Sequence, residues 1–156
     1  YFFFFFFTNM KKNIIRIALA SLLFVASITA YNYFTRQGNE GSKEVQIIIQ
    51  IDQADQDLIV LDVTKRTDDE MLGTFLETVL EEEGLDVEFA GNVTDQFGRY
   101  IIGIGEHVTK DSAVGPWWLF NSSTNPDCVS AGFCPGVDIT PLYDKDIFIF
   151  DFTSSY

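Results

Sequence analysis

Two segments rich in β-branched residues decide the fold of this chain: VQIIIQI at residues 45–51 and DLIVLDVT at residues 57–64. The residues between them, 52–56, read DQADQ and are mostly polar. Strand-like runs on both sides of a short polar stretch are typical of a β-hairpin. The sequence therefore predicts an antiparallel pair of strands at the start of the globular part.

The segment after the hairpin predicts an amphipathic helix. Apolar side chains recur at i, i+3, i+4, i+7 and i+8, namely at Leu72, Phe75, Leu76, Val79 and Leu80. Thr67 and Glu70 have the spacing of a capping box, which predicts the start of the helix. Gly84 predicts its end, because glycine readily adopts the left-handed conformation that follows many helices.

Short strands are predicted beyond the helix, at residues 87–90, 99–104, 117–121 and 147–152. The last of them, IFIFDF, is apolar on both faces, which predicts a strand that is central or covered by another layer. A hairpin, then a helix, then more strands is the order of an α+β fold. We expect a β-grasp-like domain with one helix packed across a mixed sheet, preceded by an N-terminal signal or anchor segment.

Composition excludes several classes of function. The 156 residues contain 10 Lys and Arg against 23 Asp and Glu, and every acidic residue lies at or after Glu40. A domain with this excess of acidic residues repels the phosphate backbone of nucleic acids, so nucleic acid is excluded as a partner. With one histidine and two cysteines, most metal-hydrolase and cysteine-nucleophile schemes are excluded as well, and we expect no enzyme.

The beginning of the chain divides into three segments before the globular domain. Residues 1–9 include six consecutive phenylalanines, and we interpret them as upstream sequence read through in frame, with translation starting at Met10. A genuine apolar extension is the alternative. Residues 10–34 form a signal peptide or membrane anchor, residues 35–43 a polar linker, and residues 44–156 the domain.

The segment from Met10 has the pattern of an export signal. Lys11, Lys12 and Arg16 precede the uncharged apolar run IALASLLFVASITA at residues 17–30. Cleavage after Ala30 would release the domain, whereas an uncleaved segment would anchor it in the membrane. Either outcome predicts an exported protein of the cell surface, secreted or membrane-anchored, from a bacterium of Gram-positive type.

Four segments of the predicted domain resemble the transcobalamin-like C-terminal domain family. They are GRYIIGI at residues 98–104, WWLFN at 117–121, GVD at 136–138 and LYDKDIFIF at 142–150. The resemblance covers about residues 44–152 and implies a β-grasp-like domain of bacterial surface proteins. By analogy with the vitamin carriers, it also implies cobalamin or another large planar ligand as a cofactor-like partner.

Two features depart from the family. The closing turn usually reads Asp-Gly-Asp, but here Lys145 stands in place of the glycine. The carriers also hold cobalamin between a helical barrel and this domain, and no such barrel fits in this chain. The resemblance therefore implies that a transporter subunit or another surface protein completes the ligand site.

The candidate ligand-binding residues are Trp117, Trp118, Phe120, Asn121 and His107. Side chains alternate along a strand, so we expect Trp118 and Phe120 in the core and Trp117 on the opposite face, as a rim residue or an exposed platform. His107 is either a surface residue or a ligand to a metal at the centre of a corrin. We expect the contact surface at the Trp117 end of the sheet, flanked by residues 122–135 and 103–110.

Cys128 and Cys134 are predicted to form a disulfide, because exported proteins usually oxidise such a pair. It pins the loop after the aromatic strand, and we leave open whether that loop also contacts a ligand. Asp52, Asp55 and Asp57 lack the central glycine and distal glutamate of a calcium loop, so no metal site is predicted.

Two functions remain after these exclusions. We expect an exported ligand-binding module, which captures a planar ligand such as cobalamin together with a partner protein. The alternative is a structural or adhesive protein–protein interaction domain of the cell envelope with no small ligand.

Overall fold

The computed structural model describes residues 41–53 and 57–154. The predicted read-through segment, the signal or anchor segment and most of the linker lie outside these residues. The first strand begins at Lys43, one residue before the predicted start of the domain. The elements follow one another as β1 (Lys43–Ile51), β2 (Leu58–Thr67), α2 (Leu72–Glu82), β3 (Val87–Ala90), β4 (Tyr100–Ile104), β5 (His107–Val108), β6 (Trp117–Asn121), α3 (Pro126–Ala131), the 3₁₀ turn η1 (Val137–Ile139) and β7 (Ile147–Thr153).

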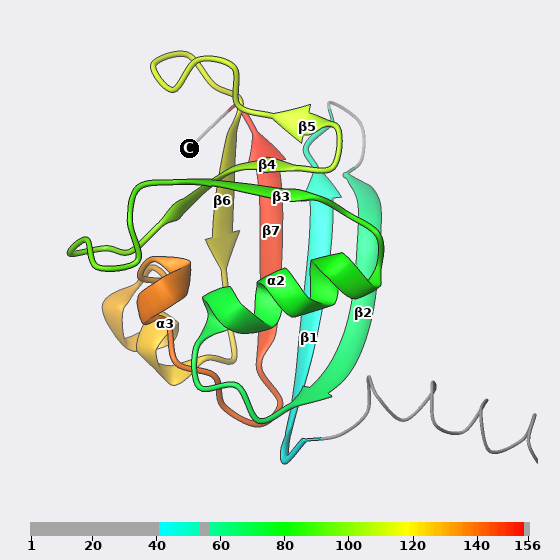
Figure 1. The fold of residues 1–156 in the computed structure, drawn as a ribbon, viewed down its shortest axis with the longest axis vertical. Helices are drawn as coiled ribbons and strands as arrows, with labels where there is room; N and C mark the ends of the chain where they lie inside the picture. Colours follow the sequence, from blue (N-terminus) through cyan, green and yellow to red (C-terminus); the bar gives the residue numbers. More distant parts are fainter. Residues whose placement is uncertain (1–40, 54–56, 155–156) are drawn as a thin grey trace, which may run out of the picture. The chain divides into compact units, whose positions relative to one another are not determined.

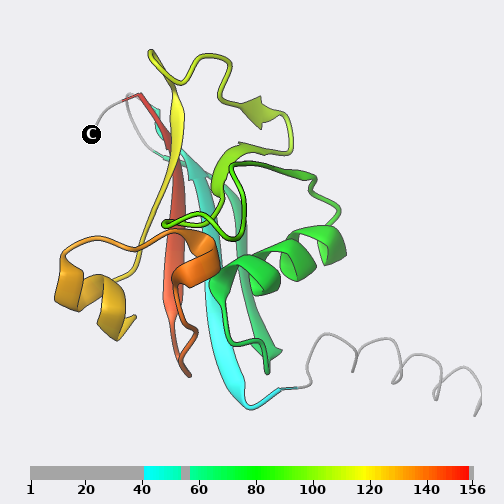
Figure 2. The ribbon, with the colours of Figure 1, turned by 60° about the vertical axis from the view of Figure 1, so that its left-hand side comes forward.

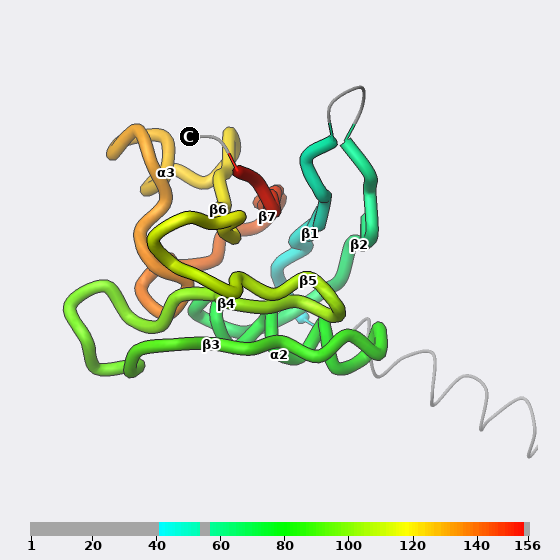
Figure 3. The backbone as a smooth tube through the Cα atoms, turned by 90° about the horizontal axis from the view of Figure 1, so that it is seen from above, coloured from blue at the N-terminus to red at the C-terminus, as the bar shows by residue number. Residues whose placement is uncertain are grey.

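The strands form two sheets. A four-stranded sheet has the order β2-β1-β7-β6, and a three-stranded antiparallel sheet has the order β3-β4-β5. In the larger sheet β1 pairs with β2 antiparallel and with β7 parallel, so the predicted α+β fold with a mixed sheet is confirmed. The helix α2 and the smaller sheet both lie over the same face of the larger sheet (Figure 1, Figure 2, Figure 3).

The core lies between α2 and the larger sheet. All five residues of the predicted apolar stripe are buried, and so are alternate residues of β1, at Val45, Ile47 and Ile49. Phe148 and Phe150 of β7 are fully buried beside them, and β7 is a central strand, as its two apolar faces predict. Each such side chain contributes roughly 1.5–3 kcal/mol through burial alone.

The helix starts later than predicted, so the capping box is wrong. β2 continues to Thr67, and α2 begins at Leu72 after Met71, whose side chain makes no capping hydrogen bond. The Leu72 amide instead donates to the Thr140 carbonyl oxygen at 2.9 Å. A partner far along the chain thus replaces the local cap, while Gly84 (φ 73°) follows the helix end as predicted.

The acidic end of α2 is compensated from the neighbouring strand. Glutamates at the end of a helix oppose its dipole. Lys65 of β2 pairs with Glu83 at 2.7 Å and with Glu82 at 3.2 Å. The hydrogen bond to Glu83 raises the pKa of Lys65, and burial opposes that shift only in part.

The turn before β7 adopts a backbone conformation that glycine favours. Lys145 has φ 71°, in the left-handed region that glycine occupies without steric cost. Its ammonium contacts the Glu44 carboxylate at 2.7 Å, and its amide donates to the Glu44 carbonyl oxygen. Lys145 therefore ties this turn to β1.

Candidate functional site

Strand β6 separates the predicted aromatic residues onto two faces. Trp118 pairs with Phe152 and Phe120 with Phe150, on the face that packs under the smaller sheet and α2. Trp118 is buried, and the Phe120 ring stacks on the Phe150 ring with centroids 5.3 Å apart. Phe120 is thus a packing residue next to the core.

His107 joins Trp118 and Phe152 in one cluster, although it comes from the smaller sheet. The indole Nε1 of Trp118 donates to the backbone oxygen of His107 at 2.9 Å. The Phe152 ring lies 4.9 Å from the Trp118 ring and 5.7 Å from the imidazole, centroid to centroid. The His107 side chain keeps 29% of its surface exposed, so the imidazole forms the open edge of an otherwise packed aromatic group.

The surroundings of His107 are sparsely bonded. Its Nε2 lies 3.9 Å from a carboxylate oxygen of Glu106, which is too long for a hydrogen bond. Thr109, two residues further on, donates its amide to the Ile102 carbonyl oxygen at 2.7 Å. Its hydroxyl oxygen is buried and finds no hydrogen-bond partner within the part of the chain that the structure describes.

Trp117 lies at the same end of β6 but on the opposite face. It is half-buried, and its Nε1 donates to the Ser112 carbonyl oxygen at 2.9 Å. Gly115 (φ 78°) passes so close that a Cβ there would lie 2.7 Å from the indole ring. The loop before β6 therefore fixes the Trp117 ring, and this ring does not share a face with Trp118.

Asn121 and the segment after it lie at the far end of β6. The Asn121 amide donates to the Asp151 carboxylate at 3.4 Å, and its side chain is exposed. Residues 122–135 follow Asn121, so they leave the strand at the end opposite Trp117 (Figure 1). The prediction that this segment and residues 103–110 flank Trp117 together is wrong for residues 122–135.

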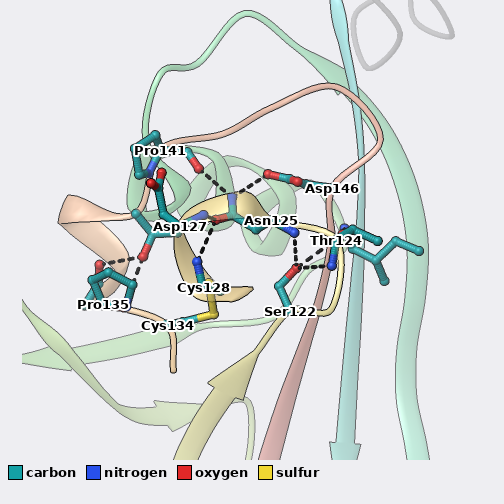
Figure 4. Close-up of a disulfide and its surroundings, with 12 residues drawn as sticks. Ser122, Thr124, Asn125, Asp127, Cys128, Cys134, Pro135, Pro141 and Asp146 are labelled. Atoms are coloured by element: carbon teal, nitrogen blue, oxygen red, sulfur yellow. Dashed lines mark hydrogen bonds between the residues drawn. A yellow bond between two sulfur atoms is a disulfide. The ribbon is translucent and has the colours of Figure 1, made fainter. Parts of the chain in front are cut away.

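That far end is built on a buried asparagine. Asn125 is fully buried and caps α3, since its side-chain oxygen accepts from the amides of Asp127 and Cys128. Its side-chain amide donates to the Pro141 carbonyl oxygen at 2.9 Å and to the Asp146 carboxylate at 2.6 Å (Figure 4). Asp146 is buried as well and also accepts from the Tyr143 amide. These bonds hold α3 against the turn that leads into β7.

The predicted disulfide is present between Cys128 and Cys134. Cys128 lies on α3 and is buried, and Gly132 ends that helix with φ 77° (Figure 4). The disulfide links α3 to the segment that connects α3 with η1. Helix α3 was not predicted from the sequence, although Asn125 followed by Pro126 is a recognisable start signal.

A partly buried ion pair fixes the segment beyond the disulfide. Asp138 of η1 accepts from the Arg99 guanidinium at 2.8 Å and from the Arg99 amide at 2.7 Å. Arg99 also bonds Glu77 of α2 and lies over the Phe89 ring, 4.3 Å from its centroid. The hydrogen bonds from Arg99 lower the pKa of Asp138, which burial alone would raise. This network is structural and lies away from His107.

Across residues 41–53 and 57–154, no three His, Cys, Asp or Glu side chains gather in a way that could hold a metal ion. Over those same two stretches, no helix is long and apolar enough to cross a membrane. The only strongly exposed aromatics there outside the predicted site are Phe97, Tyr100, Phe133 and Tyr143.

Comparison with known proteins identifies no family. No family model matches the chain, and no curated protein matches it. Among solved structures, it is similar to a protein of Ruminococcus gnavus that carries a provisional description as a metal binding protein. The two are 20% identical with a TM-score of 0.48, over 74% of this chain and 100% of the other. So distant a likeness says nothing of what this chain binds.

Proposed function

We propose that this protein is an exported binding module that captures cobalamin or another large planar ligand at the His107 end of β6. The observation that carries the proposal is the convergence of His107, Trp118 and Phe152, three side chains from three different strands. On this proposal the domain is β-grasp-like and belongs with the transcobalamin-like C-terminal domains. Its role is binding rather than catalysis.

The imidazole is the group best suited to meet such a ligand. It is held on a strand whose backbone oxygen is tied to Trp118, so its position is fixed while its edge stays exposed. A neutral imidazole is a common ligand for transition metals, and a corrin carries its metal at the centre of a flat ring. These residues fit one edge of a macrocycle.

A site that contacts only one edge of the macrocycle does not bind it tightly. Stacking on an exposed aromatic contributes about 1–3 kcal/mol by analogy with nucleobases, and that corresponds to binding weaker than millimolar. We therefore propose that a transporter subunit or another surface protein covers the other side of the ligand.

The disulfide agrees with the proposed location. A disulfide between Cys128 and Cys134 is typical of an oxidising environment outside the cytoplasm. On the proposal, residues 10–34 export the domain and either release it or keep it at the membrane.

Calorimetry of the purified full chain with aquocobalamin, and separately with a haem analogue, tests the ligand. We expect weak binding that His107→Ala reduces at least tenfold. Tyr100→Ala is the matched control, because Tyr100 is a 59% exposed ring on the same small sheet and should leave binding unchanged. Equal losses in both variants, or no heat with either tetrapyrrole in the presence of candidate partner chains, would overturn the proposal.

A second candidate function has its own observation. Phe97 and Phe133 are 66% and 67% exposed, and neither takes part in the His107 cluster. Large apolar side chains that stay in water often mark protein–protein contacts. If no tetrapyrrole binds, we propose instead a structural or adhesive module of the cell envelope, and Phe133→Ser should then weaken its association with the partner.

A further inference from the structure

Strand β2 presents an apolar edge to solvent. It pairs with β1 on one side, and no other strand of residues 41–53 and 57–154 pairs with it (Figure 1). Leu58, Ile59 and Val60 at its beginning are 49%, 58% and 40% exposed. A free edge with apolar side chains is a template for pairing with another strand.

The pairing of β2 with β1 shows which face each side chain occupies. Leu58 lies opposite Ile51 and Lys65 opposite Val45, so both are on the face that carries the core. Ile59 lies opposite Gln50 and so belongs to the outer face. The register shifts after Ile49, and Val60 is the extra residue of this bulge.

Three further residues used in the pairing argument lie on the outer face. Thr64 lies opposite Gln46, and Arg66 lies opposite Glu44. Asp57 precedes the strand, and its carboxylate accepts a hydrogen bond from Gln50 at 3.3 Å, which places it on this outer face as well.

These positions make the edge complementary to itself. If a second copy runs antiparallel with its Arg66 opposite Asp57, then Lys65 faces Leu58 and Thr64 faces Ile59. The bulged Val60 stays unpaired, Val63 faces Leu61, and the two Asp62 side chains meet at the two-fold axis, each already accepting a hydrogen bond from its own Gln46. Opposite charges directly across an antiparallel pair are favourable, and the axis repeats the Asp57–Arg66 pair, so two such pairs stand against the single Asp62–Asp62 contact.

We propose that two copies of this chain associate through their β2 edges in this register, which joins the two four-stranded sheets into one. The register covers Ile59 with Thr64 and Leu58 with the aliphatic stem of Lys65. Lys65 keeps its bonds to Glu82 and Glu83, so its ammonium remains paired while its stem packs. The proposal is independent of any ligand at the His107 end.

Cross-linking of mixed single-cysteine chains tests the register. Ile59→Cys and Thr64→Cys face each other between copies, whereas each residue is far from its own counterpart. Oxidation of the 1:1 mixture should therefore give a dimer containing one chain of each kind, and oxidation of either variant alone should give none. If one variant alone gives as much cross-linked dimer as the mixture, or if the mixture gives none, the proposed register is overturned.

Sedimentation equilibrium of the full chain tests the association itself. Ile59→Lys should raise the dimer dissociation constant at least tenfold. Val93→Lys is the matched control, since Val93 is also β-branched, is 56% exposed and gains the same charge on substitution. A chain that is monomeric at every concentration, or equal effects of the two variants, would overturn the proposal.

A charge exchange gives a third test. Asp57→Arg and Arg66→Asp should each weaken the dimer severalfold, because each puts like charges opposite one another. The double variant should recover most of the loss, because the pair is restored with its signs reversed. Failure of the double variant to recover would contradict the Asp57–Arg66 contact.

Discussion

The two ends of strand β6 are built in opposite ways. At the carboxyl end, the buried side chain of Asn125 makes four hydrogen bonds, and a disulfide lies one helical turn away. At the amino end, the imidazole of His107 is partly exposed and the hydroxyl of Thr109 has no partner among the described residues. One end thus has its polar groups satisfied inside the protein, whereas the other presents a partly exposed imidazole and keeps a buried hydroxyl without a partner among the described residues.

This difference separates stability from binding. A buried polar group costs free energy unless it is paired, so a fully bonded buried asparagine marks a place where the fold depends on each bond. A half-exposed ring with few bonds can change without unfolding the chain. We therefore expect substitutions at the carboxyl end to alter stability and substitutions at the amino end to alter binding.

The largest expected loss follows Asn125→Ala. The change leaves the Asp146 carboxylate with one fewer donor, the Pro141 carbonyl without this partner and α3 without its cap. We expect the free energy of unfolding to fall by about 2–4 kcal/mol, measured by urea denaturation. Asn121→Ala, at an exposed asparagine of the same strand, should change it by less than about 0.5 kcal/mol.

Asp138→Asn should cost about 2–3 kcal/mol at neutral pH, because it weakens a pair in which Arg99 is mostly covered. The pKa of Asp138 is lowered in the folded protein, so its charge stabilises the fold above its ordinary pKa of 3.8. That stabilisation is lost as the pH falls through the lowered folded-state pKa. Urea curves from pH 7 to pH 2 should show the difference between wild type and variant shrinking below about pH 4. A difference that stays constant to pH 2 would exclude the ion pair as its source.

Removal of the disulfide by Cys128→Ala with Cys134→Ala should cost about 2 kcal/mol by the chain-entropy estimate for so short a loop. The Asn125 bonds remain, so the chain should still fold. Reductant should lower the wild-type urea midpoint to that of the double variant and leave the variant unchanged. If reductant leaves the urea midpoint of the wild type unchanged, the disulfide contributes nothing to the stability of the fold.

The smallest effect on stability is expected for His107→Ala. The bond from Trp118 goes to the backbone oxygen of His107, so the variant keeps it and loses only the contact with Phe152. Urea denaturation should show a loss below about 1 kcal/mol. A loss as large as that of Asn125→Ala would make the imidazole a structural group and remove the contrast between the two ends.

The sequence was sufficient to predict the elements that depend on local patterns. The hairpin, the stripe of α2 from Leu72 to Leu80, the four later strands and the pairing of Cys128 with Cys134 are all present. Alternation along β6 also correctly separated Trp118 from Trp117. These features need only the periodicity of a helix or strand and the chemistry of cysteine.

The sequence was insufficient where distant segments decide the outcome. The capping pattern at Thr67 is overridden because β2 extends through that residue, and Thr140 supplies the partner for the start of α2. The division into two sheets depends on strand pairings that no local pattern records. The contact of Phe152 with His107, the basis of the candidate site, joins residues 45 positions apart.

The position of residues 122–135 was mispredicted for a simple geometric reason. A strand rises about 3.3 Å per residue, so the two ends of β6 are roughly 13 Å apart. A loop that follows Asn121 therefore cannot flank Trp117 unless it turns back along the strand.

Backbone and indole NMR shifts on addition of aquocobalamin to the full chain test most directly whether the two ends have different roles. We expect shifts at His107, Thr109, Phe152 and the Trp118 indole, with the amides of α3 unchanged, and we expect these shifts to vanish in His107→Ala. Shifts centred on α3, or shifts at the His107 end that survive His107→Ala, would contradict this division of roles.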